Sequence, residues 1–179
     1  MLHRVIGVGA VSACALLAAA TVMAQEVTKD PVTGARNFAR LGTTVACAGA
    51  TSSDALPEIK KMGFVSVINL RLASEPNADI ETAQAKAKEV GLRYFHVPFD
   101  GKPDPAAADA FLAAITSPGA EPAFIHCAGG NRAATMWLIK RLAVDGWDQE
   151  RAVKEAAALG QSSEPLRKWA IEYAAQKKR

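Results

Sequence analysis

Short apolar runs alternate with longer stretches of helical periodicity along most of the chain. Four runs dense in apolar and β-branched residues predict buried strands at residues 43–48, 64–70, 92–97 and 123–126. Elsewhere apolar side chains recur every three or four positions, which predicts helices at residues 52–62, 77–90, 104–116, 131–144, 148–159 and from 165 onward. Strands that alternate with helices indicate a parallel sheet covered on both faces. The pattern therefore predicts a single α/β domain of three layers, with a mostly parallel central sheet of about four strands flanked by helices.

The first residues have the pattern of a secretion signal. A short positive end with Arg4 precedes an uninterrupted run of apolar and small residues, 5–22, and residues 22–24 have the spacing of a cleavage site. We therefore expect residues 1–24 to be removed as a signal peptide, which places the mature chain in the periplasm or outside the cell. Two alternatives stay open. One is a lipoprotein box at Cys14, and the other is a retained anchor helix, since the run is about long enough to span a bilayer.

Length and charge narrow the class of the mature protein. Without residues 1–24 the chain has 155 residues, enough for one domain with its own core. Residues 25–42 are polar and weakly patterned and are expected as an extended lead-in to a domain at 43–179. The mature chain carries 20 basic and 18 acidic side chains, a balance too even to indicate a nucleic-acid partner. No membrane contact is expected after signal cleavage.

The candidate chemistry lies where the fourth strand ends in His126 and Cys127. A loop of four residues follows, and Arg132 stands where the next helix begins; the loop residues are Ala128, Gly129, Gly130 and Asn131. Consecutive N–H groups of such a turn form a concave nest, and the helix adds its positive end at the same point. Both favour the thiolate, which is the attacking form of cysteine. The stretch therefore predicts a nucleophile at Cys127 within an anion-binding loop.

The other side chains of this stretch have roles that fit the same site. Arg132 is able to hold a tetrahedral anion with two parallel hydrogen bonds. Gly129 and Gly130 are expected to supply the positive φ that turns several amides inward. His126 either supports the thiolate through the loop backbone or fills the strand end. The alternative for the whole stretch is a buried, inert cysteine followed by an arginine in solvent.

A proton donor for the leaving oxygen is expected on the loop after the third strand. Asp100 and Asp104 both lie there, and Asp104 precedes Pro105, which suits a helix cap. Asp100 is therefore the predicted acid, although an Asp-Gly pair is also a common turn. Arg71 ends the second strand, where it either adds positive potential to the site or pairs with Glu75.

The remaining cysteine and histidines leave two further questions. Cys47 is either a resolving partner that forms a reversible disulfide with Cys127 or a small buried apolar residue. His96 is expected as a structural residue. The cysteines and histidines of the mature chain do not have the spacing of metal ligands, so no metal site is predicted.

The spacing around Cys127 resembles the active-site loop of cysteine-dependent tyrosine and dual-specificity phosphatases. The wider sequence is similar to the bacterial phosphatase-like family related to the amino-terminal domain of beta-lactamase-hydrolase-like proteins, over roughly residues 43–159. The stretches that carry the likeness are 67–71, 92–98 and 126–132. The resemblance implies a dual-specificity-phosphatase-like fold, a phosphocysteine at Cys127, phosphoryl binding by Arg132 and the loop amides, and Asp100 as acid and then base. It implies no metal or cofactor, and a phosphorylated protein or small molecule as the substrate.

Two features depart from that phosphatase loop. The usual loop has five residues between cysteine and arginine, whereas this one has four, and Ala133 stands where a serine or threonine commonly assists the second step. The shorter spacing also resembles the loop of rhodanese sulfurtransferases, in which the cysteine carries a persulfide. A third hypothesis is a module that binds an oxyanion or senses redox state without catalysis. The sequence alone leaves these three functions open.

Overall fold

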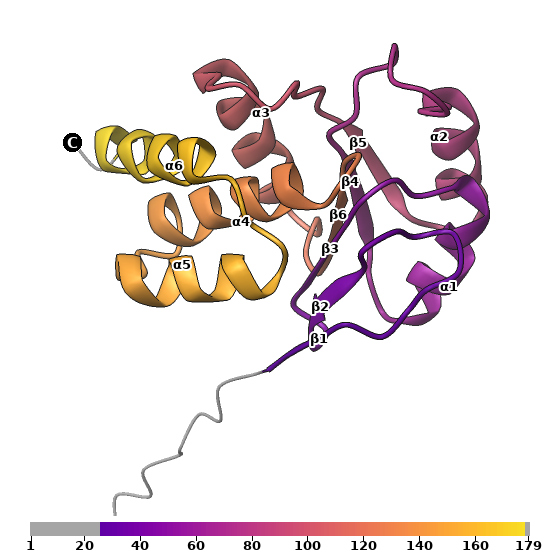
Figure 1. Ribbon diagram of the computed structural model, residues 1–179. Helices are drawn as coiled ribbons and strands as arrows, with labels where there is room; N and C mark the ends of the chain where they lie inside the picture. The colour runs from indigo at the N-terminus through magenta and orange to yellow at the C-terminus, as the bar shows by residue number, and fades with distance from the viewer. Residues whose placement is uncertain (1–25, 178–179) are drawn as a thin grey trace, which may run out of the picture.

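The computed structural model describes residues 26–177 and forms one mixed six-stranded sheet between two layers of helices (Figure 1). The strand order is β1-β2-β3-β6-β4-β5. The bounds of the strands are β1 Val27–Thr28, β2 Ala39–Leu41, β3 Val45–Ala48, β4 Ser66–Asn69, β5 Arg93–His96 and β6 Ala123–His126. The predicted α/β architecture is confirmed, and the two short strands at one edge extend it.

The four strands predicted from apolar runs form the parallel part of the sheet. β6 lies in the middle and pairs in parallel with β3 on one side and β4 on the other, while β5 pairs with β4. All residues of β3, β4 and β6 are buried, which explains why they read as continuous apolar runs in the sequence. β1 and β2 pair antiparallel, so the segment expected as an extended lead-in, residues 25–42, contributes two strands to the sheet.

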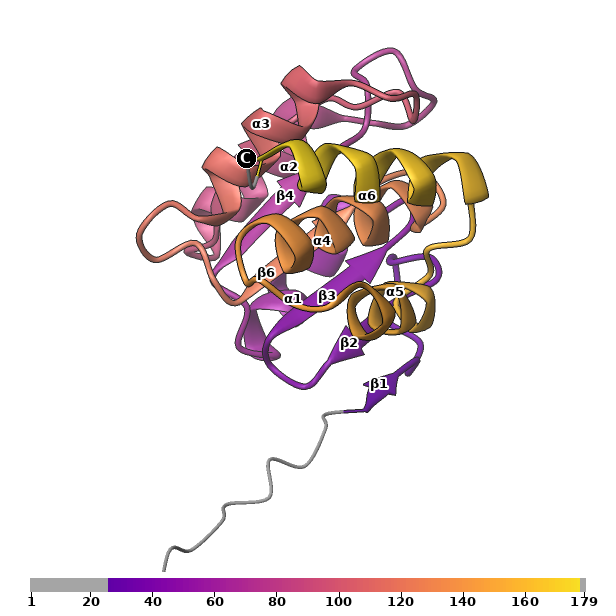
Figure 2. The same ribbon diagram turned by 90° about the vertical axis from the view of Figure 1, so that its left-hand side faces the viewer.

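Helices cover the two faces unequally, as Figure 2 shows from a second side. One face packs against the 3-10 helix η1 Ser53–Ala55 and the helices α1 Leu56–Lys61 and α2 Ile80–Glu89. The other face carries the helices α3 Pro105–Ile115, α4 Asn131–Ala143, α5 Gln149–Ala158 and α6 Glu164–Lys177. The central helix α4 is buried along most of its length because α5 and α6 pack on it.

Helix starts follow the expected caps at two positions and differ at a third. Asp104 accepts hydrogen bonds from the N–H groups of Ala106 and Ala107, and Asp148 accepts one from Arg151. α2 instead begins after Asp79, whose backbone is left-handed. The predicted cap Asn77 lies in the preceding turn, where its carbonyl accepts a hydrogen bond from Arg71. Asn77 therefore contributes a left-handed residue to the turn that binds Arg71, instead of capping α2.

The predicted signal peptide, residues 1–24, and the lipoprotein box at Cys14 lie outside the described residues. Among residues 26–177, no helix has the length and apolar character needed to cross a membrane. The parallel strands all point their carboxyl ends to the same edge of the sheet. Cys127, Arg71 and the segment around Asp100 follow three of these strands, so the topology brings them together.

Candidate active site

Cys127 lies at the floor of a loop directly after the central strand β6. The residue is 1% exposed, and its Sγ accepts a hydrogen bond from the N–H of Gly130 at 3.1 Å. Its own N–H donates to the carbonyl of Ala48 on β3. The exposure alone would fit the alternative of an inert buried cysteine. The hydrogen bond from Gly130 N–H to Sγ instead fits a nucleophile held in a cup of loop amides, formed by residues 128–131.

The loop carbonyls are bonded outward, which turns the loop amides inward. The carbonyl of Ala128 accepts a hydrogen bond from Ala50 N–H at 2.9 Å, and that of Gly129 accepts one from Asn37 Nδ2 at 3.0 Å. In a planar trans peptide the C=O and the next N–H point in opposite directions. The N–H groups of Gly129 and Gly130 therefore face away from these partners, and that of Gly130 is the one that reaches Sγ.

Gly130 and Gly49 are the two glycines that make this arrangement possible. Gly130 has φ of 102°, a conformation that favours glycine, whereas Gly129 has an ordinary φ, so only one of the two predicted positive-φ residues in the loop is left-handed. Gly49 pairs with Gly129 across the two loops, and a Cβ at Gly49 would lie 2.9 Å from the carbonyl oxygen of Ala128. The loop after β3 therefore lies so close to the loop after β6 that only glycine fits at position 49.

Asn131 begins α4 and fixes the far side of the loop. Its Oδ1 accepts hydrogen bonds from the N–H groups of Ser162 at 2.8 Å and Ser163 at 3.0 Å. The side chain of Asn131 therefore binds the connection between α5 and α6. Substrate binding by Asn131, which would use its backbone N–H, stays a prediction. The loop that follows Cys127 is consequently held from both sides.

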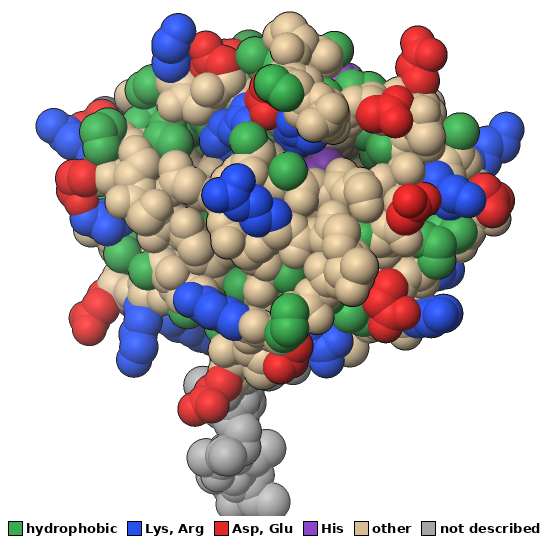
Figure 3. All heavy atoms as spheres, turned by 45° about the vertical axis from the view of Figure 1, so that its right-hand side comes forward, with side chains coloured by type: hydrophobic (Ala, Val, Ile, Leu, Met, Phe, Trp, Pro, Cys, Tyr) green, Lys and Arg blue, Asp and Glu red, His purple; other side chains and the backbone are tan. Residues whose placement is uncertain are grey.

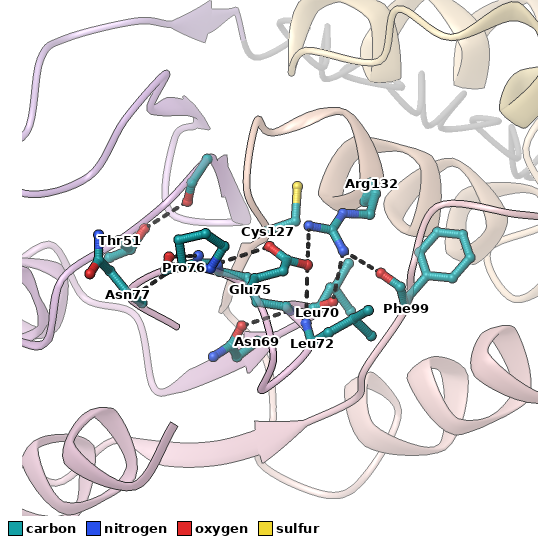
Figure 4. Close-up of polar contacts among 12 residues, drawn as sticks. Thr51, Asn69, Leu70, Leu72, Glu75, Pro76, Asn77, Phe99, Cys127 and Arg132 are labelled. Atoms are coloured by element: carbon teal, nitrogen blue, oxygen red, sulfur yellow. Dashed lines mark hydrogen bonds and ion pairs between the residues drawn. The ribbon is translucent and has the colours of Figure 1, made fainter. Parts of the chain in front are cut away.

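Arg132 lies in the first turn of α4, and its guanidinium is bound inside the site (Figure 4). It forms an ion pair with Glu75 Oε1 at 2.7 Å and donates to the carbonyl oxygens of Leu70, at 3.4 Å, and Phe99. Its side chain is 12% exposed. These bonds tie the helix that follows Cys127 to the ends of β4 and to the segment that carries Asp100.

Glu75 connects both arginines and was missed as a functional residue at the sequence level. Its Oε2 pairs with Arg71 Nε at 3.1 Å, and its Oε1 accepts the N–H of Leu72 as well as Arg132. Burial alone would raise the pKa of Glu75. The hydrogen bonds from Leu72, Arg132 and Arg71 outweigh it, so the pKa lies below its ordinary value. The sequence offered only the i,i+4 spacing to Arg71 as a signal.

Arg71 is a buried part of this network. Besides Glu75, its guanidinium donates to the carbonyls of Pro76 at 2.5 Å and Asn77 at 2.9 Å, and the residue is 4% exposed. Of the two sequence interpretations, the pair with Glu75 is the one observed, and it is buried. Arg71 adds positive charge beside Arg132 through the shared carboxylate, whereas direct substrate contact by Arg71 stays a prediction.

Asp100 lies on the loop after β5, at the surface beside the site. Its carboxylate accepts the N–H of Lys102 at 2.8 Å and pairs with Lys102 Nζ at 3.4 Å, with 42% of the side chain exposed. The backbone hydrogen bond from Lys102 is the main reason that the pKa of Asp100 lies below its usual value; Lys102 and Arg132 add charge attraction. In this conformation Asp100 is an ionised carboxylate within reach of the field of Arg132.

The two histidines near the site are held by contacts within the fold. His126 is buried and stacks on Phe124, with ring centroids 5.6 Å apart, and its Nδ1 has no hydrogen-bond partner among the described residues. Burial, together with the charges of Arg71 and Arg132, lowers the pKa of His126 to about 3, so the ring is neutral at physiological pH. His96 Nε2 is bonded to the Arg71 carbonyl at 2.8 Å, in line with its predicted structural role.

Cys47 lies on β3 in the same buried cluster as Cys127, and both thiols are free. Burial raises the pKa of Cys47, and the nearby charges of Cys127 and Glu155 raise it further. The thiol form of Cys47 is therefore favoured, and its role as a resolving partner stays a prediction. Residues 26–177 contain no cluster of three or more histidine, cysteine or acidic side chains arranged to hold a metal ion.

A cysteine below inward-facing amides, an arginine in the next helical turn and a central parallel strand define a protein of the cysteine-dependent phosphatase-like class. Three examples represent the many solved structures that share this fold. They are TpbA of P. aeruginosa, 20% identical with a TM-score of 0.57 over 83% of this chain and 92% of that chain; the core catalytic domain of the PP-IP phosphatase SIW14 from S. cerevisiae, 15% identical with a TM-score of 0.61 over 80% and 88%; and Tk-PTP in its active form, 18% identical with a TM-score of 0.63 over 80% and 97%.

Residues 37–144 match the family model described as "Beta-lactamase hydrolase-like protein, phosphatase-like domain". The chain belongs to this family, as the sequence resemblance predicted. The beta-lactamase hydrolase-like protein of Agrobacterium fabrum is 30% identical over 121 residues, which are 65% of this chain and 27% of that protein. The chain thus corresponds to one part of that longer relative.

Proposed function

We propose that this domain hydrolyses phosphate monoesters through a phosphocysteine intermediate on Cys127. The observation that carries the proposal is the Sγ of Cys127 in hydrogen-bond contact with Gly130 N–H, beside an arginine whose guanidinium is held by Glu75. Membership of the phosphatase-like family supports it. A TpbA variant of similar fold has been solved in complex with phosphotyrosine, which favours aryl phosphates of the tyrosine and dual-specificity type as substrates.

The reaction is proposed to take two steps. In the first, the Cys127 thiolate attacks phosphorus, an S–P bond forms, the P–O bond to the organic group breaks, and the leaving oxygen takes a proton from Asp100. In the second, water attacks phosphorus, Asp100 receives the proton, and the thiolate is restored as phosphate departs. The ionised Asp100 of the free enzyme suits the second step. The first step requires that Asp100 leave Lys102 and gain a proton as the substrate binds.

Arg132 connects the loop that follows Cys127 with the loop that carries the proposed acid Asp100. Its guanidinium donates to the carbonyl of Phe99, the residue before Asp100, and a Cβ at Gly101 would lie only 3.4 Å from Arg132 Cδ. A phosphoryl group that accepts hydrogen bonds from Arg132 therefore changes the contacts of the loop that carries Asp100. We also propose that the reaction takes place in an exported compartment, because residues 1–24 have the pattern of a signal peptide.

A sulfurtransferase is the second candidate, favoured by the four-residue spacing between Cys127 and Arg132. Two assays on the mature protein separate the candidates. The first follows hydrolysis of p-nitrophenyl phosphate with and without vanadate, and the second follows transfer of sulfur from thiosulfate to cyanide. Cys127→Ser serves as the inactive variant in both, and Cys47→Ser as the matched cysteine control.

The proposal predicts hydrolysis that vanadate blocks, that Cys127→Ser abolishes and that Cys47→Ser retains, with no thiocyanate formed. Thiocyanate formation without phosphate release would establish the sulfurtransferase instead. If neither assay responds while inorganic phosphate or sulfate still binds, the domain is a non-catalytic anion-binding module.

A further inference from the structure

A cavity shares a wall with the loop that follows Cys127. It has a volume of about 560 Å³, within the range of small-molecule sites, and Gly129 and Gly130 form part of its lining. The N–H of Gly130 reaches the nucleophile, so this wall is one loop thick. The opposite walls come from the segment before β2 and from the connection between α5 and α6.

The floor and the rim of this cavity differ in chemistry. Buried apolar side chains form the floor, among them Val32, Phe38 and Leu159. The rim is exposed and polar, with Lys29, Asn37 and Ser162. Lys29 is the single charged residue among those that line the cavity, and none is acidic. The cavity therefore suits a partly apolar organic group that carries a negative charge at the end near Lys29.

Two rim residues are bonded to the catalytic loop itself. Asn37 has a left-handed backbone, with φ of 50°, and donates to the carbonyl of Gly129 across 92 positions of sequence. Ser162 donates its N–H to Asn131 Oδ1. A ligand in the cavity thus touches the same residues that set the shape of the cup around Cys127.

We propose that this cavity binds the organic part of the phosphate ester, and that this part carries a second negative group, such as a carboxylate, which pairs with Lys29. The inference rests on the proposed phosphatase activity and specifies its substrate class as doubly anionic phosphate esters. Phosphate alone fills only the cup, whereas the organic group extends over the Gly129–Gly130 wall into the cavity.

A matched pair of substrates tests the charge. N-acetylphosphotyrosine and its C-terminal amide differ in one carboxylate, and kcat/KM is measured for both. The wild type should prefer the carboxylate by about two- to fivefold, as expected for an exposed ion pair, and added salt should reduce that preference. Lys29→Ala should abolish the preference, whereas Lys61→Ala, an exposed lysine on α1, should keep it.

The size of the cavity is tested with Ser162→Phe, which places a bulky ring at the rim and keeps the backbone N–H that binds Asn131. It should raise KM for both phosphotyrosine derivatives more than for phenyl phosphate, whereas Lys61→Phe, which places the same ring on the exposed surface of α1, should change KM for none of the three. Equal carboxylate preference in Lys29→Ala and Lys61→Ala, or an equal effect of Ser162→Phe on all three substrates, would overturn the inference while the phosphatase stands. A wild type that hydrolyses none of the three esters would refute the proposed activity, and this inference with it.

Discussion

Glu75 is the residue on which both arginines of the site depend. Its carboxylate receives Arg132 on one oxygen and Arg71 on the other, and a third bond comes from Leu72 N–H. Arg132 lies 57 positions after Glu75 in the sequence. No local pattern could therefore have predicted the contact, although the i,i+4 spacing did suggest the pair with Arg71. The role of Glu75 follows only from the parallel strand order.

Glu75→Gln should lower kcat/KM by about tenfold, equivalent to about 1.4 kcal/mol of transition-state binding. A neutral amide keeps the size of the carboxylate and weakens its hold on both guanidinium groups. The change is measured with p-nitrophenyl phosphate, with the exposed Glu81→Gln on α2 as control. Equal kinetics for the two variants would show that Glu75 does not position Arg132.

Asp100→Asn should lower kcat by roughly 10²-fold and change KM little, because an amide cannot exchange the proton in either step. Asp104→Asn is the matched control on the same loop. Asparagine caps a helix as well as aspartate does, so this variant should keep both activity and stability. If Asp104→Asn lowers kcat and Asp100→Asn does not, the acid is Asp104.

At the scale of elements, the loop that follows Cys127 is held by three other segments. The loop after β3 binds Ala128 and Gly129, Asn37 in the segment before β2 binds Gly129, and the α5–α6 connection binds Asn131. The sequence predicted the strand, the loop and the helix around Cys127, because each has a strong local pattern. It did not predict the brace at Gly49, since a single glycine after a strand does not identify its partner. The positive φ predicted at Gly129 was wrong, because only Gly130 is left-handed in this loop.

Gly49→Ala should destabilise the domain by about 1–3 kcal/mol and reduce activity, because its Cβ would lie 2.9 Å from the Ala128 carbonyl and force the two loops apart. Gly129→Ala is the matched variant on the other side of the pair. Its Cβ meets no atom within 4 Å, so stability should stay near that of the wild type. Urea unfolding of both variants measures the difference, and equal stability would argue against the brace.

At the scale of the whole molecule, the apolar pattern of the sequence predicts the parallel strands of the sheet but not the antiparallel strands at its edge. β3, β4 and β6 are buried on both faces and so are continuous in the sequence. β1 and β2 have two and three residues, too few to show an alternation, and β2 is identified only by its pairing with β1 and β3. The cavity beside the loop that follows Cys127 was not predicted, because its walls come from three distant segments.

The buried His126 should make the stability of the domain fall in acid. Its pKa is lowered from 6.5 to about 3, so between these values the unfolded chain binds a proton that the folded chain does not. The free energy of unfolding should therefore decrease as the pH falls below about 6.5, by up to several kcal/mol. Urea unfolding at a series of pH values measures this slope. His126→Gln should flatten it, and an unchanged slope would contradict a neutral buried imidazole.

The most direct test of the central claim is the chemical identity of the adduct on Cys127. The mature protein is mixed with p-nitrophenyl phosphate, quenched rapidly in acid and digested, and the peptide that contains Cys127 is analysed by mass spectrometry. The account predicts a phosphoryl group on the sulfur of Cys127, more abundant in Asp100→Asn, where its hydrolysis is slower. Phosphate release with no phosphoryl group on Cys127 in either protein, or a persulfide there after thiosulfate treatment and no reaction with the phosphate ester, would contradict it.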